Sequence, residues 1–144
     1  LETKYRISQE AKGRFLAGSS MGALISAYIG TRYPETFSSL GIFSIASWVS
    51  EKPFLDYLKD EGSYRKTRFF IQVGTEEVRN EDSRVDYAGS QKYISNSLNF
   101  LEGILLQGAK IENIRLYIGA GKTHNEEAWA GYMPEFLLWL NERL

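Results

Sequence analysis

The sequence predicts an α/β fold in which a mostly parallel sheet carries helices on both faces. Short apolar runs rich in β-branched and aromatic residues alternate four times with segments whose apolar residues recur at helical spacing. Glycine, proline or clusters of polar residues separate these segments, as is typical of turns. Successive strands joined through helices pair in parallel, because each crossover returns the chain to the same end of the sheet. From the length of 144 residues we expect one domain, spanning residues 1–144.

The first half of the chain predicts two strands and two helices. A short strand at 14–17 leads into a helix at 20–32. This helix should end before Pro34, because the residue preceding a proline is disfavoured in the α conformation. The second half of segment 37–46 is largely apolar and predicts a buried strand. A short helix is expected within 50–59, after the proline of that segment.

The second half of the chain predicts the same alternation. Segment 67–74 is the clearest strand, since it is rich in β-formers and closes with glycine, and a polar loop follows at 75–86. A long helix is expected over 86–107, a last strand over 111–118 and a final helix over 126–144. The long helix should bury one apolar side, formed by Tyr93, Ile94, Leu98, Leu101, Ile104 and Leu105.

Composition limits the classes of function. Apolar residues make up 43% of the chain and charged residues 24%, with a net charge of −1, so neither a polyanion nor an anionic membrane is indicated as a partner. The chain has no cysteine and one histidine, His124, which excludes disulfides, thiolate metal sites and zinc sites built on several histidines. Since no secretory leader and no membrane-spanning run are visible, we expect a cytoplasmic protein.

The most informative motif is Gly-x-Ser-x-Gly, which runs from Gly18 to Gly22 between the first predicted strand and the first predicted helix. A serine at such a strand–turn–helix junction is typical of a nucleophile elbow, in which Ser20 takes a strained backbone conformation at the tip of the turn. The flanking positions should be small, which Gly18 and Gly22 satisfy. The backbone N–H of Met21 would then point toward the reacting group and stabilise an oxyanion.

A serine hydroxyl is a weak nucleophile and needs a base, which in turn needs a carboxylate. His124 is the only histidine and follows the last predicted strand. Glu76 and Glu77 directly follow the strand at 67–74. Because the carboxyl ends of parallel strands meet at one edge of the sheet, we expect Ser20, one of the two glutamates and His124 to lie together there.

At this point the sequence resembles a known family, the putative-esterase branch of the α/β-hydrolases, which includes enterochelin-esterase-like, feruloyl-esterase-like and esterase-D-like enzymes. The resemblance rests on Ala-Gly-Ser-Ser-Met-Gly at 17–22, Arg-Tyr-Pro-Glu-Thr-Phe at 32–37, Val-Gly-Thr-Glu-Glu at 73–77, and Gly-Lys-Thr-His-Asn-Glu followed by Trp129 at 121–129. The order serine, acid, histidine is that of the α/β-hydrolases.

The resemblance implies a role for each candidate residue. Ser20 corresponds to the nucleophile, His124 to the base and Glu77 to the acid, with Glu76 in reserve and the Met21 N–H in the oxyanion site. If neither glutamate served, Asp82 or Asp86 in the following loop would be the acid, or a serine–histidine dyad would act alone.

The resemblance also implies an α/β-hydrolase fold that lacks its N-terminal strands. The family places several strands before the elbow, and one of the loops there supplies a second oxyanion N–H. This sequence begins close to the elbow, so we expect it to be the C-terminal part of such a domain, from the nucleophile elbow to the terminal helix. The alternative is a compact variant that dimerises across the exposed edge of its sheet. A smaller departure is Gly22-Ala23, where many members have two glycines.

We therefore predict a serine hydrolase that cleaves carboxylic esters through an acyl-enzyme, with a small-molecule ester as substrate and without a metal or organic cofactor. Two alternatives remain open. The same residues would serve an acyltransferase, and a non-catalytic hydrolase-like module could bind carbohydrate or a partner. Trp48, Tyr87, Trp129 and Tyr132 are aromatic residues that would line a substrate pocket or belong to the core.

Overall fold

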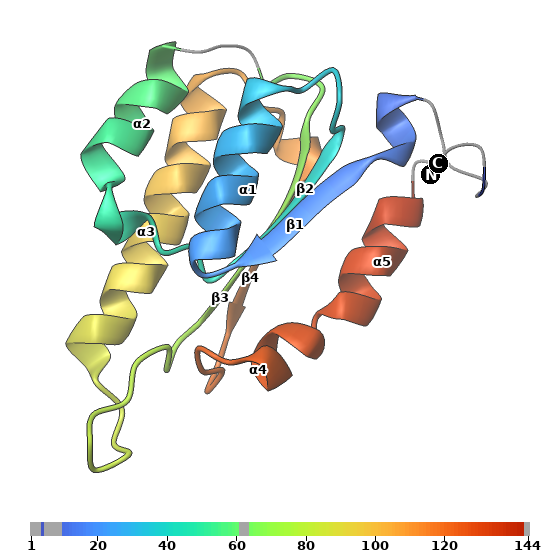
Figure 1. Cartoon of the computed structure of the whole chain (residues 1–144). Coiled ribbons are helices and arrows are strands. Elements are labelled where there is room, and N and C mark those ends of the chain that lie inside the picture. Colours follow the sequence, from blue (N-terminus) through green and yellow to red (C-terminus); the bar gives the residue numbers. More distant parts are fainter. Residues whose placement is uncertain (1–3, 5–9, 61–63, 143–144) are drawn as a thin grey trace.

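A single four-stranded parallel sheet forms the centre of the molecule (Figure 1). The computed structural model describes residues 4, 10–60 and 64–142. The strands are β1 (Phe15–Ser19), β2 (Ser39–Phe43), β3 (Arg68–Gly74) and β4 (Ile114–Gly119), and they lie in the sheet in the order β1-β2-β3-β4. Every neighbouring pair is parallel, so the four carboxyl ends meet at one edge.

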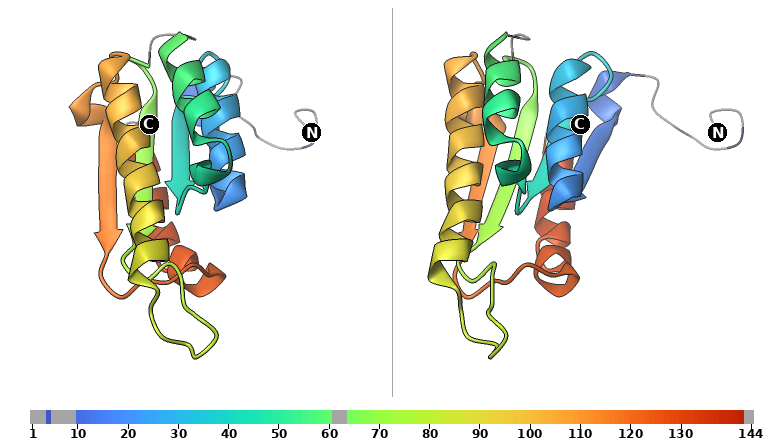
Figure 2. Two further views of the ribbon diagram at one scale, coloured as in Figure 1. Left: turned by 90° about the vertical axis from the view of Figure 1, so that its left-hand side faces the viewer. Right: turned by 60° about the vertical axis from the view of Figure 1, so that its left-hand side comes forward.

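Helices cover both faces of this sheet, which confirms the predicted α/β architecture (Figures 1 and 2). They are α1 (Met21–Arg32), α2 (Glu51–Asp60), α3 (Tyr87–Leu106), α4 (Glu126–Ala130) and α5 (Met133–Asn141). Helices α1, α2 and α3 lie on one face, and α5 lies on the other (Figure 1). Three short 3₁₀ turns complete the described elements: η1 (Ala11–Gly13), η2 (Ser47–Val49) and η3 (Ile111–Asn113). None of the helices in the described part of the chain is long and apolar enough to cross a bilayer.

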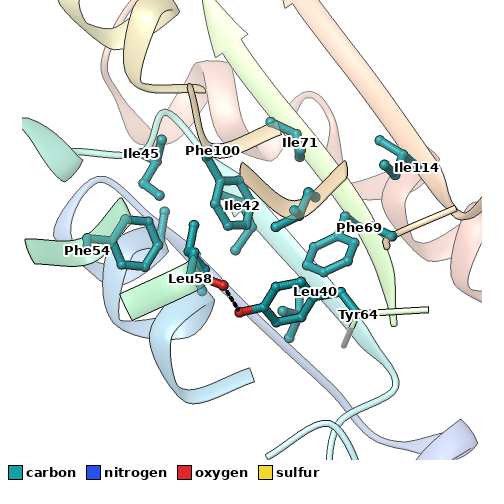
Figure 3. Close-up of a cluster of buried hydrophobic side chains, with 14 residues drawn as sticks. Leu40, Ile42, Ile45, Phe54, Leu58, Tyr64, Phe69, Ile71, Phe100 and Ile114 are labelled. Atoms are coloured by element: carbon teal, nitrogen blue, oxygen red, sulfur yellow. Dashed lines mark hydrogen bonds between the residues drawn. The ribbon is translucent and has the colours of Figure 1, made fainter. Parts of the chain in front are cut away.

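The larger core lies between the sheet and α1, α2 and α3 (Figure 3). Leu40, Ile42, Phe69 and Ile71 point into it from β2 and β3, and all four are fully buried. Both strands are buried on both faces, as expected for central strands of a parallel sheet.

A smaller core on the opposite face holds α5 against the sheet. Phe136 lies edge-on to Phe43 and packs against Phe70, with ring centroids 5.8 and 5.3 Å apart. The guanidinium of Arg68 lies 4.1 Å from the centre of the Trp139 ring and donates to the carbonyl oxygens of Trp139 and Leu140 at 2.5 and 3.2 Å. A cation at these carbonyls complements the negative end of the helix.

Several element boundaries differ from those predicted. Strand β2 occupies 39–43, earlier than the second half of 37–46, and residues 111–113 form a 3₁₀ turn in place of the start of a strand. The final helix predicted over 126–144 is wrong in the described residues, because it is divided into α4 and α5. Pro134 has no N–H to donate to the carbonyl of Ala130, so a continuous helix would lose this bond and clash at the ring.

The buried side of α3 agrees only in part with the predicted apolar side, since Ile104 is buried and Leu101 and Leu105 pack against the larger core. Its fully buried residues are Ser90, Asn96, Ser97, Phe100 and Ile104, whereas Leu98 is 40% exposed. Two of these three polar side chains bond to loops at the sheet edge, whereas the Ser97 hydroxyl is buried without a hydrogen-bond partner among the described residues. The Ser90 hydroxyl accepts from Val78 N–H at 3.0 Å, and Asn96 Oδ1 accepts from Trp48 N–H at 2.9 Å.

Candidate active site

Ser20 occupies the single residue between β1 and α1, at the carboxyl edge of the sheet. Its φ of 57° and ψ of −122° lie in a region that side-chain-bearing residues rarely adopt, so the predicted strain at this position is present. Neighbouring strand ends hold the strained turn. Ser20 N–H donates to the Phe43 carbonyl at 2.9 Å, and the Ser20 carbonyl accepts from Ala46 N–H at 3.2 Å.

The two glycines of the motif differ in what they allow. A Cβ on Gly18 would lie 2.3 Å from the carbonyl oxygen of Gly22 and 2.8 Å from Ser26 Oγ, so no side chain fits there. A Cβ on Gly22 would meet nothing within 4 Å. The expectation that both flanking positions must be small is therefore wrong for Gly22. What the turn requires is the close approach of the Gly22 backbone to Gly18.

His124 lies within hydrogen-bond distance of Ser20. It follows β4 through the glycine-containing loop 119–124, and its Nε2 is 2.8 Å from Ser20 Oγ. Two aromatic rings hold the imidazole. Tyr93 of α3 lies at a centroid distance of 4.7 Å, and Trp129 of α4 meets the imidazole edge-on at 4.9 Å. These contacts from two helices fix the plane of the ring.

Glu77 lies on the other side of His124. Its Oε2 is 2.7 Å from His124 Nδ1, and its side chain is fully buried. Oε1 accepts from the Ser44 hydroxyl at 2.6 Å and from Gly74 N–H at 2.5 Å. A carboxylate accepts hydrogen bonds only, so Nδ1 carries the proton and the Nε2 of a neutral ring is left as an acceptor facing Ser20.

The loops that carry the acid and the histidine are joined to each other through their backbones. Thr75 N–H donates to Gly119 O, and Glu76 N–H donates to Lys122 O, both at 3.0 Å. A Cβ on Gly74 would lie 2.1 Å from Lys122 O, so the end of β3 accommodates this loop only because residue 74 is glycine. The distance from Glu77 to His124 is therefore set by direct contact of the two strand ends.

Glu76, the alternative candidate for the acid, does not contact His124. Its Oε2 pairs with Arg79 at 2.6 Å in a partly exposed position. Neither of the loop aspartates is brought there. Asp86 caps α3 by accepting from Gly89 N–H at 2.9 Å, and Asp82 is exposed. Of these four carboxylates, Glu77 is the one that contacts the imidazole.

Met21 begins α1 directly after Ser20. The N–H groups of a helix's first turn have no carbonyl partner within the helix and carry the positive end of its dipole. The Met21 N–H therefore stands at a helix N-terminus beside the serine, where an anionic oxygen would be stabilised.

Sequence reasoning did not single out Ser44, which directly follows β2 and is completely buried. Its hydroxyl lies between Glu77 Oε1 at 2.6 Å and the indole Nε1 of Trp129 at 3.0 Å. The one available signal was its position after a strand, at the same edge as Ser20 and Glu77.

A cavity of about 660 Å³ lies beside this arrangement, between η2, the start of α2 and the first half of α3. Tyr93 lines the cavity and also contacts His124, although His124 itself does not line it. Trp48 lines it as well and is 52% exposed. The other aromatic candidates do not line it. Tyr87 is exposed, whereas Trp129 and Tyr132 pack against the smaller core. Among the described residues, no group of three or more potential metal ligands is clustered.

Comparisons with known proteins identify the family and the fold. A family model described as putative esterase matches residues 1–140. "Uncharacterized protein YbbA" of Bacillus subtilis (strain 168) is 23% identical over 143 residues, which are 97% of this chain and 54% of that protein. The chain thus spans about half the length of this curated relative.

Solved structures share the fold. A ferulic acid esterase is 17% identical with a TM-score of 0.71, over 96% of this chain and 55% of that one. The enterobactin esterase FES from Shigella flexneri is 20% identical with a TM-score of 0.76, over 96% of this chain and 34% of that one. The fold is accordingly that of the α/β-hydrolases. Together with the match of the family model over nearly the whole sequence, this places the chain in the putative esterase family.

Proposed function

We propose that this chain carries the catalytic centre of a serine esterase, which cleaves carboxylic esters through an acyl-enzyme on Ser20. One observation carries the proposal: an unbroken line of contacts from Ser20 Oγ to His124 Nε2 at 2.8 Å and from His124 Nδ1 to Glu77 Oε2 at 2.7 Å. The strained φ of 57° at Ser20 and the full burial of Glu77 support it.

In the proposed reaction, His124 Nε2 takes the proton from Ser20 Oγ as this oxygen attacks the ester carbonyl. The new negative charge on the carbonyl oxygen lies near the N-terminus of α1, where Met21 N–H donates to it. The imidazolium then protonates the leaving alcohol, and an ester of Ser20 remains. Water, activated by His124, hydrolyses this ester and restores the serine. Glu77 holds the ring and stabilises its charged form.

The proposed partner is a small-molecule ester, and no nucleic acid, membrane or cofactor enters the scheme. Under the alternative of a compact variant, two copies would associate along the outer edge of β1, where Phe15 is 46% exposed. Sedimentation equilibrium at two protein concentrations would test this. One monomeric mass at both concentrations would contradict it.

The decisive test of the proposed chemistry is Ser20→Ala. Loss of the hydroxyl should reduce hydrolysis of a short p-nitrophenyl ester by about 1000-fold or more, because the remaining groups have no nucleophile to act on. The melting temperature should change little, since alanine at φ 57° carries the same backbone strain as serine.

A fluorophosphonate probe supplies the second readout. The wild-type protein should be labelled on Ser20, and Ser20→Ala should not be labelled. A folded full-length protein that neither hydrolyses esters nor reacts with the probe would instead be the non-catalytic module considered from the sequence. A protein that labels but releases its acyl group only to an added alcohol would be an acyltransferase using the same residues.

A further inference from the structure

We propose that Ser44 is a positioning residue of the active site, and that Trp129 fixes the direction in which its hydroxyl donates. The Ser44 hydroxyl holds the Glu77 carboxylate so that one oxygen remains turned to His124. This inference rests on the serine esterase function proposed above. It adds two residues to the proposed catalytic residues Ser20, His124 and Glu77.

The backbone conformation of Ser44 is unfavourable for a residue with a side chain. Ser44 has a φ of 48° and is completely buried, with its N–H donating to the Gln72 carbonyl at 2.7 Å. Glycine adopts this left-handed region without strain, whereas a residue with a Cβ does not. The side chain is therefore held against its own conformational preference. The contacts that offset this strain are the two hydrogen bonds of its hydroxyl.

The direction of these hydrogen bonds follows from the groups at the two ends. The indole Nε1–H of Trp129 can only donate, and the Glu77 carboxylate can only accept. The Ser44 hydroxyl between them, at 3.0 and 2.6 Å, must accept from Trp129 and donate to Glu77. A hydroxyl normally rotates freely between alternatives, but here one orientation satisfies every group.

Because the Ser44 hydroxyl donates in one fixed direction, each oxygen of the Glu77 carboxylate has its own partners. Oε1 takes both Ser44 O–H and Gly74 N–H, and Oε2 faces His124 Nδ1. Rotation of the carboxylate would break all three contacts together. Without the Ser44 hydroxyl, only the Gly74 N–H remains on Oε1, and the buried carboxylate loses one of its charge-assisted hydrogen bonds. The imidazolium formed during the reaction would then be less well oriented.

The first experiment compares Ser44→Gly and Ser44→Ala with the wild type. Both remove the hydroxyl, but glycine relieves the strain at φ 48° and alanine keeps it. Each variant should lower kcat by about 10-fold with little change in KM, as expected when a hydrogen bond to a charged group is lost. Trp129→Phe keeps a ring beside His124 but removes the N–H, and it should lower kcat by a smaller factor of about 3.

A matched control is available in Ser83→Gly. Ser83 also has positive φ, at 61°, but it is exposed in the loop between β3 and α3. Relief of strain at Ser83 should leave kcat and KM unchanged. If Ser44→Gly retained wild-type kcat, activity would not depend on the Ser44 hydroxyl, and the positioning role would be overturned.

The second experiment tests whether Ser44 acts through Glu77. In a Glu77→Gln background, Ser44→Gly should lower kcat by less than about 2-fold, because the group that it positions is already lost. Independent losses that multiply would overturn the inference. Failure of the proposed esterase function can be told apart from failure of this inference. In all of these measurements, only the activity that Ser20→Ala abolishes is counted. If no such activity exists, the esterase proposal itself fails.

Discussion

Glu76 and Glu77 are adjacent glutamates with opposite surroundings. The Glu77 side chain is fully buried among three hydrogen-bond donors, whereas Glu76 pairs with Arg79 near solvent. Neighbouring side chains on an extended chain point in opposite directions, so the end of β3 can turn only one of them toward the histidine. The difference between the two lies in placement, because their chemistry is the same.

Their amide variants should therefore differ strongly. Glu77→Gln should lower kcat/KM by about 30- to 1000-fold, because an amide cannot stabilise the imidazolium and favours the wrong tautomer. Glu76→Gln should change it by less than about 3-fold, as exposed ion pairs contribute little. Steady-state kinetics on a p-nitrophenyl ester would measure both. A larger loss in Glu76→Gln would show that the wrong glutamate has been assigned.

The residues of the site differ in how visible they are in the sequence. Ser20 stands in a five-residue motif between a strand and a helix, and His124 is the only histidine, so the amino-acid sequence alone marks both as candidates. Ser44 carries no such mark. It meets Glu77 across 33 positions through the pairing of β2 with β3, and a serine after a strand is too common to indicate this.

At the scale of elements, the turn from β1 to α1 is the most constrained junction. Its tightness depends on contact between the backbones of Gly18 and Gly22, and only Gly18 has its Cβ direction blocked. Gly22 lies in the first turn of α1, where alanine is a better helix former than glycine.

The two glycines therefore offer a matched pair of variants. Gly18→Ala should lower the free energy of unfolding by about 3 kcal/mol, since its methyl group would overlap a backbone oxygen. Gly22→Ala should raise it by about 0.5–1 kcal/mol. Urea unfolding followed by circular dichroism would measure both. Equal destabilisation of the two variants would contradict the geometry described for the turn.

Whether a segment forms a strand or a helix was easier to predict than where it ends and which of its sides is buried. All four strands follow from apolar runs and β-formers, and α1 and α3 follow from apolar spacing. The short helix α2 was predicted from Pro53, but it begins before this proline, at Glu51. The division between α4 and α5 was missed because the helical apolar pattern continues through Pro134, although the ring prevents one hydrogen bond. The polar residues on the buried side of α3 were missed because Ser90 and Asn96 are buried through hydrogen bonds to loops outside the helix, which apolar spacing does not reveal.

At the scale of the whole molecule, the site and the cavity form where several elements converge. Loop 75–86 and helix α4 both lie beyond the carboxyl edge of the sheet (Figures 1 and 2). The cavity lies between η2, which contributes Trp48, the start of α2, which contributes Glu51, and α3, which contributes Tyr93. We expect one part of the substrate to occupy it.

Trp48→Ala tests this placement. Loss of an aromatic wall should raise KM by about 5- to 10-fold and leave kcat nearly unchanged, as expected for a contact distant from the reacting atoms. Tyr87→Ala is the matched control. Tyr87 begins α3 and is 75% exposed, but it does not line the cavity. Equal effects of the two variants, or a loss confined to kcat, would show that the substrate binds elsewhere.

The order of strands in the sheet has a consequence for how the chain folds. Each strand pairs with the strand that precedes it in the sequence, so the sheet can extend by short-range steps as synthesis proceeds. The contact between Ser20 and His124 is different, because it spans 104 positions and closes only when all four strands are in place. Catalytic competence should therefore appear after secondary structure during refolding, which makes ester turnover a reporter of the last stage of assembly.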